Sequence, residues 1–143
     1  MHRVIELSRS VFVALAGIGF AGVVLLARSS GAAENTPGSS PQFYTEHVQP
    51  IFQANCYRCH AGLNHRGGLQ LDTRAALMRG GKDGVVIVPG HPEQSLLVTL
   101  IRHEGPGSDP RPMPPKDKLS DADIATITEW IRGGAVMPPD PAE

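Results

Sequence analysis

Two cysteines and a histidine stand close together in the middle of the chain, in the sequence Cys56-Tyr57-Arg58-Cys59-His60. Two thiols one helical turn apart can each add to a vinyl group of haem, and the imidazole of the next residue then reaches the iron. This C-x-x-C-H spacing is the pattern of c-type haem attachment. The segment therefore predicts one covalent haem c, attached through Cys56 and Cys59, with His60 as an axial ligand of the iron.

Two other kinds of site use paired cysteines. A dithiol redox centre of the thioredoxin type lies between a strand and a helix of a βαβ unit, and the sequence predicts no such unit. A tetrahedral zinc site needs further Cys or paired His at ligand spacing, which the remaining histidines do not offer. Haem attachment is the favoured interpretation, and a colourless protein would instead indicate a dithiol oxidoreductase.

A six-coordinate haem iron needs a second axial ligand from elsewhere in the chain. The favoured residue is Met113, in Arg111-Pro-Met-Pro-Pro115, because prolines on both sides restrict the backbone that presents its soft thioether. Met137-Pro-Pro139 repeats this chemistry but follows the last predicted helix, near a chain end. The other methionine and histidine candidates, with more ordinary explanations as core or surface residues, are Met78, His47, His65, His91 and His103.

The first 33 residues are typical of a targeting segment rather than of a folded domain. Arg3 and Arg9 precede an uncharged apolar run at 11–27, and small residues follow up to Ala33. This order is typical of a secretory signal peptide, although the run is also at the short limit of a transmembrane anchor. Both interpretations predict a periplasmic or other extracytoplasmic location, with a membrane tether through residues 11–27 if the leader is kept.

Composition narrows the function classes. The chain has 143 residues, about the length of one domain, and a formal net charge of -1, so a basic nucleic-acid-binding surface is not expected. Residues 34–143 contain ten basic and thirteen acidic residues, a formal charge of -3 that favours a partner with a basic patch. Aromatic residues make up only 5%, which favours a prosthetic group that fills part of the interior.

The predicted elements are helices separated by loops. Ser40 and Pro41 begin a helix that runs toward Asn55, with a kink or division at Pro50. Asp72 is expected to cap a brief helix over 73–79, and a further helix is expected from Pro92 through Ile101. Residues 104–118 carry five prolines and predict an irregular loop, and Ser120 caps a last helix that ends at Gly133. An extended run at 85–88 is too short for a real sheet.

These motifs, in this order, resemble a known family. From Phe43 to Pro139 the chain looks like the planctomycete-type cytochrome c domain, within the single-haem c-type cytochromes. Besides the haem tetrad, the resemblance is carried by Val48-Gln-Pro-Ile51, Gly67-Gly-Leu-Gln-Leu-Asp72, Gly80-Gly81, Ile87-Val-Pro-Gly90 with Pro92 and Ser95-Leu-Leu97, Met113-Pro-Pro115, and Trp130-Ile131 with Gly134-Ala135. One departure is His91, where such domains often carry Asp.

The resemblance implies an all-α, loop-rich fold of three to four helices around one covalently attached haem, with His60 and Met113 on the iron. The expected domains are a signal peptide or anchor at 1–33, a linker at 34–42, the cytochrome c domain at 43–139 and a tail at 140–143. Cationic or hydrogen-bonding partners for the haem propionates are expected among Arg58, Arg66, Arg111, Lys116 and Trp130.

A haem iron with both axial positions filled has no open site, so the predicted activity is electron transfer and not catalysis. The expected partners are a redox protein donor and a redox protein acceptor, docked transiently. Two alternatives remain open. The domain could be a haem-containing subunit or module of a larger periplasmic oxidoreductase, or a haem-based ligand sensor in which Met113 is displaced.

Overall fold

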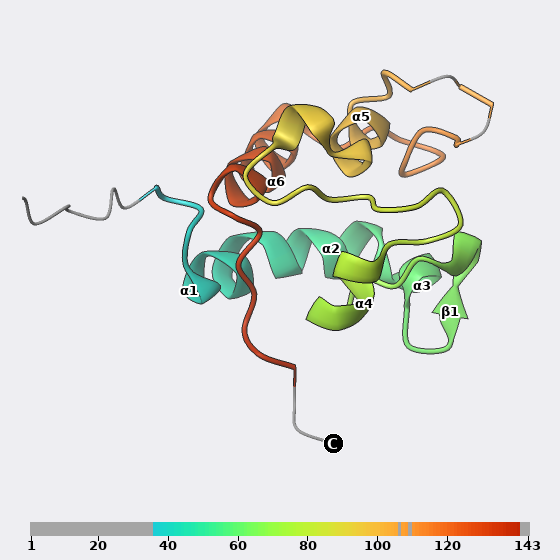
Figure 1. Ribbon diagram of the computed structural model, residues 1–143. Coiled ribbons are helices and arrows are strands. Elements are labelled where there is room, and N and C mark those ends of the chain that lie inside the picture. Colours follow the sequence, from blue (N-terminus) through green and yellow to red (C-terminus); the bar gives the residue numbers. More distant parts are fainter. Residues whose placement is uncertain (1–35, 106, 109, 141–143) are drawn as a thin grey trace, which may run out of the picture. The chain divides into compact units, whose positions relative to one another are not determined.

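The computed structural model describes residues 36–105, 107–108 and 110–140 (Figure 1). The predicted signal peptide or anchor at 1–33, the first two residues of the predicted linker and the last three of the predicted tail lie outside this part of the chain. Within it, no helix is long and apolar enough to cross a membrane.

The first helical stretch runs from Pro41 to Asn55 in three parts. Ser40 caps helix α1 (Pro41–Phe43), since its hydroxyl accepts a hydrogen bond from the Phe43 N–H at 3.1 Å. A π-helical segment, η1 (Tyr44–Val48), then leads into α2 (Gln49–Asn55). The division falls at Gln49, just before Pro50, whose missing N–H cannot continue the regular hydrogen-bond ladder.

Cys56 separates α2 from a single helical turn, α3 (Tyr57–His60). The chain then turns back as a tight hairpin, in which His60 bridges to His65 and Ala61 to Asn64. The two-residue strand β1 (Asn64–His65) and the 3₁₀ turn η2 (Arg66–Gly68) complete it. The described residues form isolated bridges but no sheet, as the sequence predicted.

Helix α4 (Arg74–Arg79) is capped differently from the sequence prediction. Thr73, not Asp72, is the cap, and its hydroxyl accepts from the Ala76 N–H at 3.3 Å. Two further N–H groups of the first turn, at Arg74 and Ala75, donate to the carboxylate of Asp140 at 2.7 and 2.9 Å. These bonds lower the pKa of the Asp140 carboxyl. The prediction that Asp72 caps α4 is wrong, because Thr73 and Asp140 accept from the N–H groups at the start of this helix.

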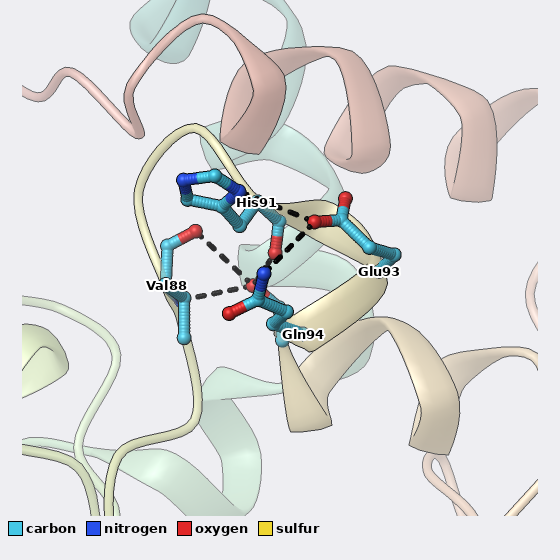
Figure 2. A network of polar contacts seen from close by, with 5 residues as sticks. Val88, His91, Glu93 and Gln94 are labelled. Atoms are coloured by element: carbon cyan, nitrogen blue, oxygen red, sulfur yellow. Dashed lines mark hydrogen bonds and ion pairs between the residues drawn. The ribbon is translucent and has the colours of Figure 1, made fainter.

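In the turn that begins the second half of the domain, where Figure 2 labels Val88 and His91, the organising residue is the buried Ser95. Its hydroxyl donates to the His91 carbonyl at 3.0 Å and accepts from the Val88 N–H at 2.9 Å. The expected single helix from Pro92 is therefore split at Ser95 into a 3₁₀ turn, η3 (Pro92–Gln94), and α5 (Leu96–Ile101). Beside this turn, Nδ1 of His91 lies 3.2 Å from the Glu93 carboxylate.

An irregular loop follows α5, as the prolines predicted, and leads to α6 (Asp121–Arg132). Ser120 caps α6 by accepting from the Asp123 N–H at 3.1 Å, and Gly133 follows its last residue. The core lies between α6, the first helical stretch and α5. Its largest members are three aromatic rings of Tyr44, Phe52 and Trp130, with Trp130 centred 5.4 Å from Tyr44 and 5.8 Å from Phe52.

We expect Ser95→Ala to lower the free energy of unfolding by about 1–3 kcal/mol, because it leaves the part-buried Val88 N–H without its acceptor. Chemical denaturation of the purified protein measures this. The control is Ser39→Ala, at an exposed serine, which should change stability by no more than about 0.5 kcal/mol. Equal effects of the two substitutions would show that Ser95 does not hold this turn together.

Candidate functional site

The two cysteines, the histidine and Met113 all line one cavity of about 240 Å³. Cys56, Cys59 and His60 reach it from the start and the body of α3, and Met113 reaches it from the loop after α5. In Figure 1 this loop and α3 lie on opposite sides of the segment that leads toward η3. The structure therefore brings the four residues of the predicted haem site to one place, although they are up to 57 positions apart in the sequence.

The cavity walls are mainly apolar and come from segments that are distant in sequence. Helix α5 supplies Leu96, Leu97, Leu100 and Ile101, and further apolar lining comes from Leu69, Leu71, Val86, Pro110, Pro114 and Pro115. Its charged lining residues, all of them exposed, are Arg66, Lys82, Asp83 and Arg111. An apolar interior with charged groups among its exposed lining suits a flat, largely apolar ring that carries carboxylates.

The imidazole of His60 is held by a backbone carbonyl. Its Nδ1 lies 3.3 Å from the Leu69 oxygen, which can only accept, so Nδ1 carries the proton and donates. Nε2 then keeps its lone pair and is the nitrogen available for a metal. This is the usual arrangement of a metal-ligating histidine, in which the second nitrogen is fixed by an outer acceptor. The sequence did not identify Leu69, because every residue has a carbonyl and no side-chain type marks the acceptor.

The two thiols are half-buried and are not joined by a disulfide. Burial, with a smaller contribution from neighbouring Cys59, raises the pKa of the Cys56 thiol to about 12. A raised pKa keeps the Cys56 thiol protonated at neutral pH. No group of three or more His, Cys, Asp or Glu side chains that could hold a metal ion occurs among residues 36–140 as far as they are described.

Met113 is positioned through its backbone. Its N–H donates to the Leu100 carbonyl at 3.0 Å, which ties the proline-rich loop to the end of α5. The other methionine of a proline segment, Met137, is buried in the core and does not line the cavity. Met78, His47, His65, His91 and His103 are likewise outside the cavity lining.

Two of the five residues expected near the propionates, Arg66 and Arg111, line the cavity, whereas Arg58 and Lys116 are exposed elsewhere. Trp130 is fully buried, and its indole N–H donates to the Val136 carbonyl at 2.9 Å. The expectation for Trp130 is therefore wrong: its one donor is already used inside the protein, because the ring packs between Tyr44 and Phe52 in the core.

The family described as Planctomycete cytochrome C matches residues 56–117, which begin at the haem tetrad and include Met113. This confirms the resemblance that the sequence motifs indicated, since the matched segment is similar to planctomycete cytochrome c. It spans less than half of the chain. No curated protein and no solved structure is similar enough to the chain to count as a match.

The match to this family implies haem c with its iron and suggests a role in haem-based electron transfer. Domains of this class are typically extracytoplasmic. The residues around the cavity fit such a group: paired thiols and an oriented imidazole come from α3, a thioether comes from the proline loop, and apolar side chains line the space between.

We expect Gly81→Ala to disturb this site, because a Cβ on Gly81 would lie 2.7 Å from the Gly67 carbonyl oxygen and 3.1 Å from the Leu69 nitrogen. Displacing residues 67–69 moves the carbonyl that holds His60. The free energy of unfolding should fall by about 1–3 kcal/mol, and the fraction of purified chains that carry haem should fall with it.

Chemical denaturation and the ratio of haem to protein absorbance measure the two effects. Ala75→Ser, on an exposed position of α4, is the control and should leave both unchanged. A Gly81→Ala protein with the haem content and stability of the original would contradict the supporting role of residues 67–69.

Proposed function

We propose that this protein is an exported monohaem c-type cytochrome that carries single electrons between redox partners. The observation that carries the proposal is the convergence of Cys56, Cys59, His60 and Met113 on one apolar cavity. In this proposal the two sulfurs attach one haem c covalently, and His60 and Met113 are its axial ligands. Helices α2, α3 and α5 contribute lining residues to the cavity and would lie around the haem.

Bound haem would supply an iron that alternates between ferrous and ferric states, and this chain's residues set the conditions for that change. Leu69 fixes the His60 ring through Nδ1, and the Leu100 carbonyl fixes the backbone of Met113. A thioether is a weak donor that favours the ferrous form, and apolar walls act in the same direction, so we expect a positive midpoint potential.

The proposed propionate partners are Arg66 and Arg111, the two sequence candidates that line the cavity. A guanidinium group pairs well with a carboxylate because two N–H groups can donate side by side. Both arginines are exposed, so they can meet the propionates where the cavity opens to solvent.

The proposed location is periplasmic or otherwise extracytoplasmic, with residues 1–33 as a signal peptide or N-terminal anchor. The donor and the acceptor are proposed to be redox proteins that dock transiently where the haem edge reaches the surface, since a small interface permits rapid release. The charge of -3 over residues 34–143 favours a partner with a basic patch.

Replacing the proposed sixth ligand tests the proposal. We expect Met113→Ala to abolish the ferric absorption band at the red end of the visible spectrum that arises from iron–thioether bonding. It should also lower the midpoint potential and allow immediate cyanide binding, because an axial position is opened. The measurements are visible spectroscopy, redox titration and cyanide binding on the purified holoprotein.

The matched control is Met137→Ala, at a buried methionine outside the cavity. It should keep the band and the potential, although the lost packing lowers stability by about 2–5 kcal/mol. A wild-type protein with high-spin ferric iron that binds cyanide at once would contradict the electron carrier. That result would favour the ligand sensor, or a haem subunit of a larger periplasmic oxidoreductase.

We also expect the double substitution Arg66→Gln with Arg111→Gln to shift the midpoint potential and to raise its dependence on pH near neutrality, because uncompensated propionates take up protons more readily. Redox titration between pH 5 and pH 9 measures this. Arg58→Gln, at an exposed arginine outside the cavity, is the control. A double variant that titrates as the control does would remove both arginines from the propionate site.

A further inference from the structure

Asp72 makes contacts that its expected role as a helix cap does not explain. Its Oδ2 accepts a hydrogen bond from the Gly62 N–H at 2.9 Å. Its other oxygen, Oδ1, is buried and has no hydrogen-bond partner among the described residues. Burying half of a carboxylate in this way is unfavourable, and such groups call for an explanation. Thr73 and Asp140 already accept hydrogen bonds from the N–H groups at the start of α4. The role of Asp72 is therefore to be sought in its bond to Gly62.

Gly62 belongs to the hairpin that begins at His60, and this hairpin is joined to a short following segment by three hydrogen bonds. The Leu69 carbonyl lies 3.3 Å from Nδ1 of His60, and the Leu71 N–H donates to the His60 carbonyl at 2.8 Å. The third bond is the one from the Gly62 N–H to the Asp72 carboxylate. The segment 69–72 therefore holds the ring of His60, its backbone and the turn just after it.

The hairpin turn is the part that most needs this support. Gly62 has a positive φ of 56° and is exposed, as are Leu63 and Asn64 beside it. Inside the hairpin, an imidazole nitrogen of His65 contacts the Gly62 carbonyl. Of the three bonds, only the bond to Gly62 uses a side chain of segment 69–72, because Leu69 and Leu71 contribute backbone groups. Within this segment, it is therefore the bond that an amino-acid change can remove without altering the backbone.

The negative charge of Asp72 also reaches two tyrosines near the cysteines. The hydroxyl groups of Tyr44 and Tyr57 lie 3.3 Å apart. Burial is the main reason that the pKa of each tyrosine is raised, and the charge of Asp72 adds to both shifts. The Asp72 carboxylate, which is bonded to Gly62, therefore also acts electrostatically on Tyr44 and Tyr57.

We propose that Asp72 is a positioning residue for the haem: by fixing Gly62, it keeps segment 69–72 against the hairpin and so preserves the bond between the Leu69 carbonyl and His60. This inference rests on the proposed function, in which His60 ligates the iron. Loss of the Asp72 bond should loosen the ring of His60, so that its Nδ1 proton exchanges more readily and the potential of the iron changes.

Hydrogen exchange in the reduced holoprotein, followed by NMR, tests this proposal. In Asp72→Ala, the Nδ1 proton of His60 and the Gly62 amide should each exchange about tenfold faster, which is the effect of losing one hydrogen bond to a charged group. Amides of α6 should keep their rates, and the midpoint potential should move. Asp72→Asn retains a carbonyl oxygen that can accept from Gly62, so it should restore both exchange rates to within about threefold of the original.

The control is Asp117→Ala, at an exposed carboxylate of the proline loop, which should change none of these quantities. If Asp72→Ala does not fold, Asp72→Ser gives the same comparison, because its shorter side chain cannot reach Gly62. Unchanged exchange at His60, or equal acceleration at His60 and in α6, would overturn the proposal. The absorption spectrum of each variant shows separately whether haem is attached, so this failure is distinguishable from failure of the proposed function.

Discussion

The imidazole of His60 can ligate iron through Nε2 only if that nitrogen keeps its lone pair; in the neutral ring the proton is then on Nδ1, where an acceptor fixes the tautomer and the orientation. The Leu69 carbonyl is that acceptor, at 3.3 Å. Segment 69–72 is in turn held by its bonds to the hairpin and by the close approach of the turn at Gly81. A half-buried ring thus receives its orientation from backbone groups, which have fewer conformations than a side-chain partner would have.

The rest of the fold brings a second ligand candidate and apolar side chains to the cavity that this histidine lines. Ser95 closes the turn before α5, and α5 presents its leucines to the cavity and its Leu100 carbonyl to Met113. The aromatic group of Tyr44, Phe52 and Trp130 joins α6 to the helix that leads to Cys56. The chain has few large side chains, and three of them form this junction. The walls of the cavity are formed mainly by aliphatic residues.

Features set by neighbours in sequence could be predicted, and features set by distant contacts could not. The caps at Ser40 and Ser120 and the haem tetrad depend on spacings of a few residues. The Asp140 bond to Arg74 spans 66 positions, and no local pattern indicates it. Asp72 was misplaced because a carboxylate beside a helix start can serve the helix or a distant N–H, and the choice is made by tertiary structure. The assignment of residues 1–33 as a signal peptide or anchor stays a prediction, as do the domain boundaries.

In the proposed function, one haem is bonded to the sulfur atoms of Cys56 and Cys59. Intact mass, measured together with the visible spectrum after denaturation, tests it most directly on protein made where c-type haem is attached. We expect the polypeptide mass plus that of one haem, with the pigment retained by the unfolded chain. A bare polypeptide mass, or a pigment that separates on unfolding, would contradict it.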